Sequence, residues 1–255
     1  MSTEKAKSSW QEALRCREEL IKKWINNTIS LFESEVKTNK SIDHLCVTSL
    51  TVSSKYCEAI IRSLAVGCRM PAKALLRVLF ELSVKLLWCL MIPEERKLVA
   101  DNVIEEKIKR WAKSTVTQDI RILRRFKECI ADNGVSELEN RIKKFEDIGK
   151  SLDCNQMPKF AKLVKELPGS WSKELYTQCY LQFNNAAHLD VTSLGGRVKE
   201  IGNKLFVDSD SEEKVQDLAQ YCVTFEHTIL YLVRTHYNCD TKEMDKQFRI
   251  EPCHV

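Results

Sequence analysis

Glycine and proline are scarce in this sequence, with 7 and 5 occurrences among 255 residues. So few residues of these two types leave little of the turn chemistry that a many-stranded sheet requires. Charged residues make up 30% of the chain and hydrophobic residues 44%, which suits long helices that bury one face and expose the other. We therefore expect an all-α helical bundle, with disorder confined to the chain ends.

Several short motifs that mark well-known chemistry are also missing. The sequence has no Walker loop, no GxGxxG, GxSxG or HExxH pattern and no CxxC pair, which argues against ATP hydrolysis, dinucleotide redox chemistry and zinc proteolysis. Its 11 cysteines are odd in number and dispersed along the sequence. Such a set indicates reduced thiols in helix cores rather than a framework of disulfides. We expect no cofactor and no metal ion. Because no signal peptide precedes these cysteines, we expect a cytoplasmic protein.

No long apolar run is free of charges. The best candidate for a membrane span, residues 70–92, is interrupted by Lys73, Arg77, Glu81 and Lys85, and a charge at the centre of a bilayer is costly. We therefore predict a core helix of a soluble protein and no contact with a membrane.

The same four charged residues are each four positions apart, so on a helix they form one continuous polar stripe. Two interpretations follow. In the first, the stripe is an ion-pair ladder that faces water and needs no function. In the second, Arg77 and Glu81 face an internal cleft, because charges on so apolar a helix are costly unless they are paired or used.

Hydrophobic periodicity divides the chain into a single domain over residues 1–255 with about seven to nine helices. Helices are expected over residues 8–38, 41–66 and 70–92, and residues 94–150 form a charged helical layer or insert. The remaining elements are a loose segment with one short helix (152–170), a helix (171–189), a small β-hairpin (198–201 with 204–207), a last long helix to residue 237, and a tail (240–255).

Residues 105–128 carry eight positive and four negative charges, although the whole chain has a net charge of only +4. Trp111 and Phe126 lie within this basic window. Cations that hold phosphates and rings that stack on bases are what a nucleic-acid surface requires, so RNA is one candidate partner. The other interpretation is a solvated helix face without a ligand. The candidate contacts to RNA are Lys109, Arg110, Arg121, Arg124 and Arg125.

A second polar group lies in the run from Tyr180 to Asp190. Asn184 precedes His188 by one helical turn, and the alanines between them leave room for a ligand. Histidine titrates near neutral pH, which suits proton transfer. Alternatively, His188 only stabilises the end of its helix or packs in the core. A glycine pair and the expected hairpin follow this helix, an arrangement that favours the rim of a pocket.

Two runs of the sequence carry a resemblance to a known family. They are Ala74-Leu-Leu-Arg77-Val-Leu-Phe-Glu81 and Tyr180-x-x-Phe183-Asn-Asn-Ala-Ala-His188. With the expected hairpin and last helix, they resemble a prokaryotic all-helical family of unknown function, over roughly residues 45–92 and 170–238. In that family an arginine and a glutamate of one helix and a later histidine recur, and these positions match Arg77, Glu81 and His188.

That family is similar in turn to HEPN-type helical proteins, many of which are metal-independent ribonucleases of toxin or antiviral defence systems. Those proteins typically hold arginine and histidine on one helix in an R-x(4-6)-H motif. Here Arg77 and His188 lie on different expected helices. The one match by spacing, Arg249 to His254, is interrupted by Pro252. The sequence thus departs from the HEPN motif in where its arginine and histidine lie.

The resemblance implies a metal-independent endoribonuclease, in which His188 is the general acid or base, Arg77 stabilises the charge on the phosphate, and Glu81 orients Arg77. Asn184 and Tyr180 would contact the substrate beside the basic window. The alternative is a non-catalytic interaction or sensor module. Its Arg-Glu-His cluster would be structural, and its charged layer would recruit a protein partner or a second copy of the chain.

Overall fold

The structure, a computed structural model, describes residues 3–35, 41–92, 97–129, 135–166, 180, 183, 198–201, 204–207 and 212–248. Within these residues the chain is dominated by eight helices, and its strands form two short pairs. The expected all-helical class is therefore confirmed. The helices are α1 (Thr3–Glu35), α2 (Ser41–Ala65), α3 (Arg69–Leu90), α4 (Asp101–Lys127), α5 (Val135–Ser151), α6 (Phe160–Lys165), α10 (Glu212–His236) and α11 (Lys242–Phe248).

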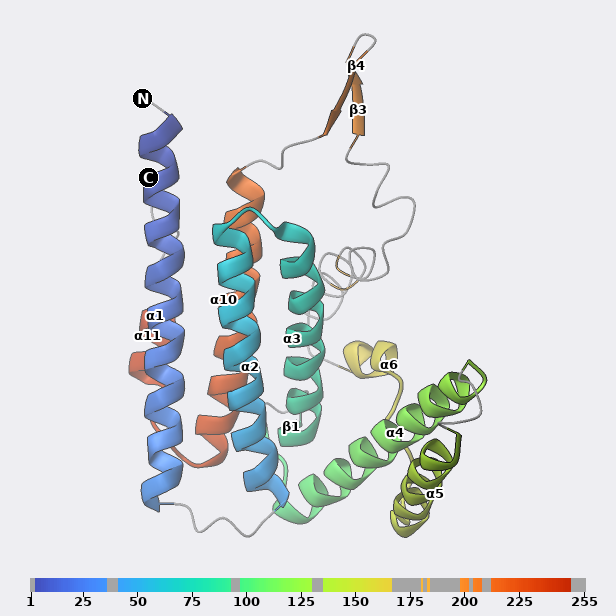
Figure 1. Ribbon diagram of the computed structural model, residues 1–255. Helices are drawn as coiled ribbons and strands as arrows, with labels where there is room; N and C mark the ends of the chain where they lie inside the picture. Colours follow the sequence, from blue (N-terminus) through green and yellow to red (C-terminus); the bar gives the residue numbers. More distant parts are fainter. Residues whose placement is uncertain are drawn as a thin grey trace.

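Four long helices, α1, α2, α3 and α10, form the body of the molecule (Figure 1). Helix α10 packs against each of the other three, and α2 packs against α1 and α3. Their apolar faces meet in one core, in which the ring centroids of Phe80 on α3 and Phe225 on α10 are 5.1 Å apart. Packing of this kind stabilises amphipathic helices far more than helix propensity does.

Helix α3 is the apolar helix that the sequence predicts at residues 70–92. Its fully buried residues include Leu76, Leu79 and Val84, and the charged residues lie on one remaining side. Among the described helices, none combines the length and the apolarity that crossing a bilayer requires.

The turn from α2 to α3 follows from one glycine. Gly67 has a φ of 78°, a left-handed conformation that residues with a Cβ rarely adopt. The amide of Gly67 donates to the carbonyl of Leu64 at 3.0 Å, and the amide of Cys68 donates to the carbonyl of Ser63 at 2.7 Å. These bonds satisfy carbonyl groups at the end of α2. The helix therefore ends at the glycine, as the sequence predicts.

Helices α4 and α5 occupy the charged segment expected at residues 94–150 and pack on each other (Figure 1). The first half of α4 contacts the core, where Ile104 is fully buried and Trp111 is partly buried. The second half runs away from the core, and there Ile122 and Phe126 are exposed. The two halves of α4 therefore have different surroundings.

The segment from residue 152 to 159 connects α5 to α6 and is fastened to α4. The amide of Met157 lies 3.1 Å from the carbonyl oxygen of Arg110 and 2.8 Å from the hydroxyl of Ser114. Phe160 of α6 then packs edge-on against an aromatic ring of α3. In its described part, this segment is a fixed connection.

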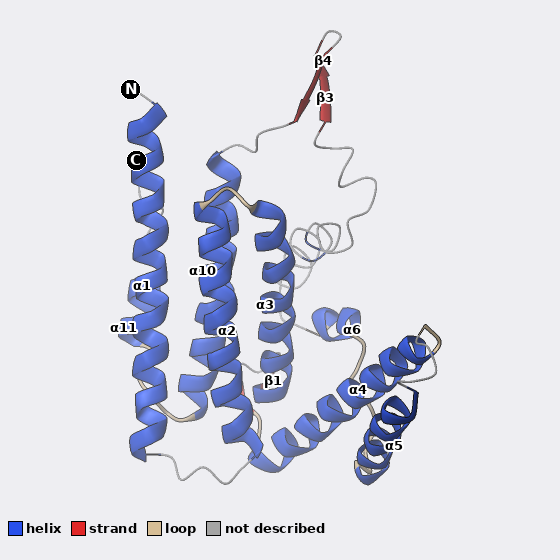
Figure 2. Ribbon diagram, viewed as in Figure 1, coloured by secondary structure: helices blue, strands red, loops and turns tan. Residues whose placement is uncertain are grey.

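Two short antiparallel strand pairs accompany the helices (Figure 2). Strand β1 (Met91–Ile92) pairs with β2 (Lys97–Leu98), and β3 (Val198–Ile201) pairs with β4 (Lys204–Val207). Figure 2 shows β3 and β4 apart from the helices. A two-stranded ribbon that does not pack on helices is marginally stable, so the small β-hairpin expected before the last long helix stays a prediction.

The expected tail over residues 240–255 is wrong for its first half. Residues 242–248 form α11, which packs on α10 with Met244 fully buried. The Nε2 atom of His227 on α10 lies 2.7 Å from a carboxylate oxygen of Asp245 on α11. A helix this short has little stability of its own, so its formation depends on these contacts. Residues 249–255 lie outside the described residues.

Candidate functional site

The polar stripe of α3 is an ion-pair ladder. The Nε atom of Arg77 lies 3.2 Å from Oε1 of Glu81, and the Nζ atom of Lys85 lies 3.7 Å from Oε2 of the same carboxylate. The side chains of Arg77, Glu81 and Lys85 are 20%, 25% and 24% exposed. The charges are therefore paired, as the first interpretation expected, and largely covered rather than facing water. An internal cleft beside Arg77 and Glu81, the second interpretation, stays a prediction.

Tyr180 covers Arg77. The Nη2 atom of Arg77 donates to the hydroxyl oxygen of Tyr180 at 3.4 Å, and the guanidinium carbon lies 5.1 Å from the centroid of the tyrosine ring. A guanidinium is attracted to the face of an aromatic ring, more strongly where water is excluded. Glu81 and Tyr180 thus both hold the guanidinium of Arg77.

Aromatic contacts anchor Tyr180 on the core. Its ring centroid lies 5.0 Å from that of Phe160 on α6. Three residues later, Phe183 is 1% exposed, and its ring packs edge-on against Tyr221 of α10 with centroids 6.0 Å apart. Residues 180 and 183 are therefore fixed beside the polar stripe of α3.

The two sequence motifs meet at this contact. Arg77 belongs to the first motif and Tyr180 to the second, and their hydrogen bond joins residues 103 positions apart. Asn184 and His188, which follow Tyr180 in the sequence, lie outside the described residues. The described part of the candidate site therefore consists of Arg77, Glu81 and Tyr180.

Two cations of α4 lie over Trp88, near the end of α3. The Nζ atom of Lys107 and the guanidinium carbon of Arg110 lie 5.3 Å and 5.5 Å from the centroid of the Trp88 ring. Lys107 also donates to the backbone carbonyl of Trp88 at 2.7 Å. Burial lowers the pKa of Lys107, and the positive charge of Arg110 adds to this effect. The two side chains are thus fixed cations rather than freely solvated ones.

These residues continue a line of cations that begins on α3. The Nζ atom of Lys85 lies 5.7 Å from the centroid of Trp111 on α4, so the polar stripe of α3 runs up to α4. Eight residues separate Arg77 from Lys85, which is about 12 Å along a helix. We call Arg77, Lys85, Lys107 and Arg110 the cation track; each of them is partly buried.

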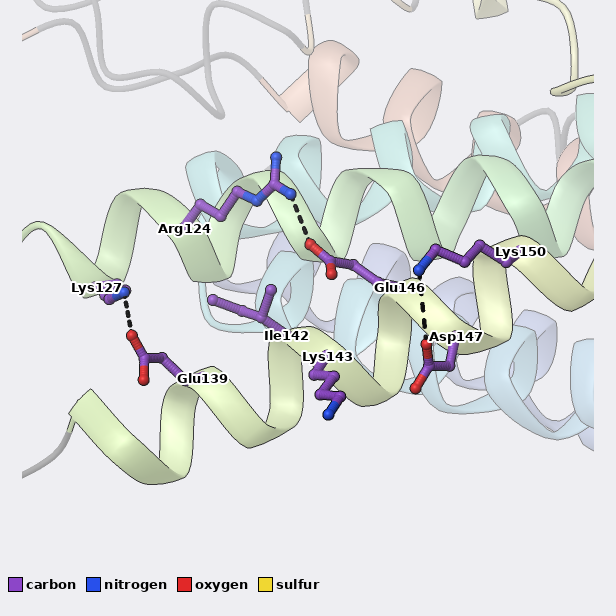
Figure 3. A pocket seen from close by; sticks show the side chains of 8 residues that line it. All are labelled: Arg124, Lys127, Glu139, Ile142, Lys143, Glu146, Asp147 and Lys150. Carbon is purple, nitrogen blue, oxygen red and sulfur yellow. Dashed lines mark hydrogen bonds and ion pairs between the residues drawn. The ribbon is translucent and has the colours of Figure 1, made fainter.

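Between α4 and α5 lies an open groove of about 390 Å³ (Figure 3). On its wall Arg124 pairs with Glu146 at 2.6 Å, and Lys127 pairs with Glu139 at 2.5 Å. These carboxylates neutralise the cations that would otherwise attract a phosphate. The groove is therefore a seam of ion pairs between two helices rather than an anion site.

The structure divides the predicted basic window. Arg110 belongs to the cation track, whereas Arg121 and Arg125 are exposed on the second half of α4. Arg125 follows Arg110 by fifteen residues, which is about 22 Å along a helix. Lys109 is exposed on the first half of α4. The basic residues that the sequence groups together thus do not form one surface with Arg77.

One buried acid, Glu226, was not predicted from the sequence. Glu226 of α10 is fully buried, and its carboxylate accepts hydrogen bonds from Ser53 at 2.9 Å and from Cys57 at 3.3 Å, both on α2. Burial raises the pKa of Glu226 to about 7, against the opposing effect of these two hydrogen bonds. The sequence does contain a signal for this buried acid. Glu226 follows Cys222 by one turn on an apolar helix face, where acids are rare.

The described residues offer no obvious place for a metal ion. Groups of three or more histidine, cysteine, aspartate or glutamate side chains at metal-binding distance do not occur among them. His227 has one carboxylate neighbour, Asp245, and two ligands fall short of a zinc site. The chemistry of the described site is that of guanidinium, carboxylate, ammonium and phenol groups.

Replacing Tyr180 with alanine is expected to lower the free energy of unfolding by about 2 kcal/mol, because Phe160 and Arg77 both lose a contact. Tyr180→Phe keeps the ring and removes only the 3.4 Å hydrogen bond, so its expected loss is below about 1 kcal/mol. Urea unfolding followed by circular dichroism measures both variants. Equal losses would show that the ring does not anchor this segment.

Comparisons with curated proteins and with solved structures find no match. A family model does match, over residues 43–205. The matched region includes most of α2, all of α3, the α4 and α5 pair, and both Arg77 and Tyr180. The chain therefore belongs to this family, which is described as a family of unknown function (DUF5677).

Proposed function

We propose that the protein is a metal-independent endoribonuclease, related to HEPN-type proteins of prokaryotic toxin or antiviral defence systems, whose active site combines Arg77 with His188. The contact between Arg77 and Tyr180 supports the proposal most directly, because it joins the two motifs of the resemblance. His188 follows Tyr180 by eight residues in the sequence. The motif that contains His188 therefore begins with Tyr180, the residue that contacts Arg77.

The proposed reaction uses the RNA's own 2′-hydroxyl. This oxygen attacks the adjacent phosphorus, the bond to the 5′-oxygen breaks, and a cyclic phosphate and a free 5′-hydroxyl result. His188 acts as the general acid or base for these proton transfers. Arg77 stabilises the negative charge that develops on the phosphate oxygens. Glu81 orients the guanidinium through the 3.2 Å ion pair.

The rest of the cation track would hold the RNA backbone. Lys85, Lys107 and Arg110 lie on the continuation of the stripe that starts at Arg77. Their partial burial and their aromatic neighbours limit their motion, so a bound phosphate would meet cations already in position. Affinity that depends on such contacts falls as the salt concentration rises. Asn184 and Tyr180 are the proposed contacts to the nucleotide nearest the reaction.

A different observation favours a second function. Arg77, Glu81 and Tyr180 satisfy one another as members of a structural cluster do. On this account the chain is a non-catalytic interaction or sensor module. The cluster then joins α3 to the Tyr180 segment, and the layer of α4 and α5 recruits a protein partner or a second copy.

Cleavage of a mixed-sequence RNA pool distinguishes the two functions. In the presence of EDTA, the wild-type chain is expected to cleave, and His188→Ala and Arg77→Gln are each expected to slow cleavage about 100-fold. His44→Ala is the matched control, because His44 is an exposed histidine of α2. Thermal melting of each variant shows whether a loss of activity comes from unfolding.

Cleavage rate and melting temperature together distinguish the nuclease from the interaction module. Loss of cleavage by His188→Ala with an unchanged melting temperature supports the nuclease. If the wild-type chain does not cleave RNA, or if His188→Ala cleaves as fast as His44→Ala, the nuclease proposal fails. A wild type without cleavage whose melting temperature falls on substitution of His188 supports the interaction module.

A further inference from the structure

Helix α4 carries one apolar stripe along its length, but only the first half is covered. Ile104 is 0% exposed, and Ile108 packs partly against the core. Ile122 and Phe126 follow these two residues by eighteen positions each, which is five whole helical turns and therefore the same face. Yet Ile122 is 54% exposed and Phe126 is 56% exposed. Among the described residues, the apolar stripe of α4 therefore extends beyond the core that covers its first half.

Helix α5 does not cover this part of the stripe, because it lies on another side of α4. Val116 faces α5 next to Gly149 and is 9% exposed. It precedes Ile122 by six residues, a rotation of about 120° around the helix. Figure 1 shows the second half of α4 leaving the four-helix core with α5 alongside. In the described part of the chain, no helix packs over Ile122 and Phe126.

Two arginines beside the stripe have no ion-pair partner among the described residues. They are Arg121 and Arg125, which are exposed and lie one turn apart. Arg124, on the side of α5, contrasts with them because it pairs with Glu146 at 2.6 Å. The outer α4 face, as we name this surface, consists of Arg121, Ile122, Arg125 and Phe126.

We propose that the outer α4 face binds an amphipathic helix of a partner protein, one that carries acidic residues beside its apolar stripe. Phenylalanine and arginine are enriched in the cores of protein interfaces, and arginine is common among the side chains that dominate binding. Apolar residues one turn apart match the anchors of a helix laid against them. The two unpaired arginines select a partner with carboxylates at its rim.

Two other occupants fit this surface less well. A second copy in a two-fold contact would present the same face, so arginines would meet arginines with no acid among them. A single strand of RNA requires a row of cations with several stacking rings, whereas the outer α4 face offers two arginines and one ring, Phe126. The proposal is independent of the nuclease, because the cation track lies on α3 and on the first half of α4.

Charge reversal provides a direct test with the full chain. Two fluorescein-labelled amphipathic peptides of about 20 residues share a leucine stripe, and glutamates flank it in one and lysines in the other. By fluorescence anisotropy, the wild type is expected to bind the glutamate peptide about tenfold more tightly than the lysine peptide. Arg121→Glu with Arg125→Glu is expected to reverse this order, and Ile122→Asp to weaken binding of both peptides about tenfold.

Matched variants on α5 serve as controls. Ile148→Asp introduces the same charge at a residue that is 39% exposed, and Arg141→Glu reverses the charge of an exposed arginine of α5. Both variants should bind like the wild type. An unchanged order of the two peptides after charge reversal would overturn the proposal. So would a wild-type dimer that Ile122→Asp converts to a monomer, or a labelled oligouridine that needs the two arginines while neither peptide binds.

Discussion

Between about pH 4.5 and about pH 7, the protein is expected to lose roughly 3 kcal/mol of stability through one side chain, Glu226. Burial raises the pKa of this carboxyl from its ordinary value of 4.5 to about 7. Within that window the folded state keeps a proton that the unfolded state releases. The contribution is therefore fully present below about pH 4.5 and is lost as the pH rises through about 7.

Glutamine at position 226 isolates this effect, because it has the same shape and does not ionise. Urea unfolding of the wild type and of Glu226→Gln, at several pH values from 5 to 8, gives the difference in stability at each. The difference is expected to move by roughly 3 kcal/mol in favour of Glu226→Gln as the pH rises. A constant offset from altered hydrogen bonds to Ser53 and Cys57 does not affect this trend.

Glu139→Gln on α5 is the control. Its carboxylate pairs with Lys127 at the surface and its side chain is 55% exposed, so no comparable change with pH is expected. Parallel pH curves for the wild type and Glu226→Gln would contradict a neutral, buried carboxyl in the folded state.

Replacing Phe80 with alanine is expected to lower the free energy of unfolding by about 4 kcal/mol. Phe80 is 1% exposed, and its ring centroid lies 5.1 Å from that of Phe225 and 5.8 Å from that of Phe160. Truncation removes these contacts and leaves a cavity between three helices. The Phe160 ring that supports Tyr180 also loses its own support, so the candidate site should loosen together with the core.

Phe126→Ala tests the opposite case on the same residue type. Phe126 is 56% exposed, so its expected loss is below about 1 kcal/mol. Urea unfolding compares the two variants, and Phe80→Leu, expected to lose less than Phe80→Ala, guards against a variant that does not fold. Similar losses for Phe80→Ala and Phe126→Ala would mean that the aromatic contacts of the core contribute little.

The long helices could be predicted from the sequence because their signals are local. The periodicity of buried residues and the glycine at position 67 predicted a helix over residues 41–66, and α2 spans Ser41–Ala65. The pairing of Arg77 with Glu81 was likewise predictable, since residues four apart on a helix are neighbours. Short α11 was missed, because its seven residues are too few to show a period.

The residues of the candidate site could be singled out from the sequence, but the contact between Arg77 and Tyr180 could not. Residue type and motif singled out Arg77, Glu81 and Tyr180, yet nothing in the sequence places the phenol over the guanidinium. The basic residues of 105–128 were grouped as one surface for the same reason, because the sequence does not show which side chains each of them contacts. Arg110 and Arg124 look alike in the sequence, but one lies over Trp88 and the other pairs with Glu146.

By itself, therefore, the sequence determined that the chain is helical, where its long helices lie, and that charges cross its most apolar helix. These properties depend on preferences that act within one or two helical turns. Only the tertiary structure decided that Tyr180 covers Arg77 and that Ser53 and Cys57 hydrogen-bond to buried Glu226. It also decided that the second half of the apolar stripe of α4 is exposed. Each of these depends on which surfaces pack together across many residues, and no local pattern encodes that choice.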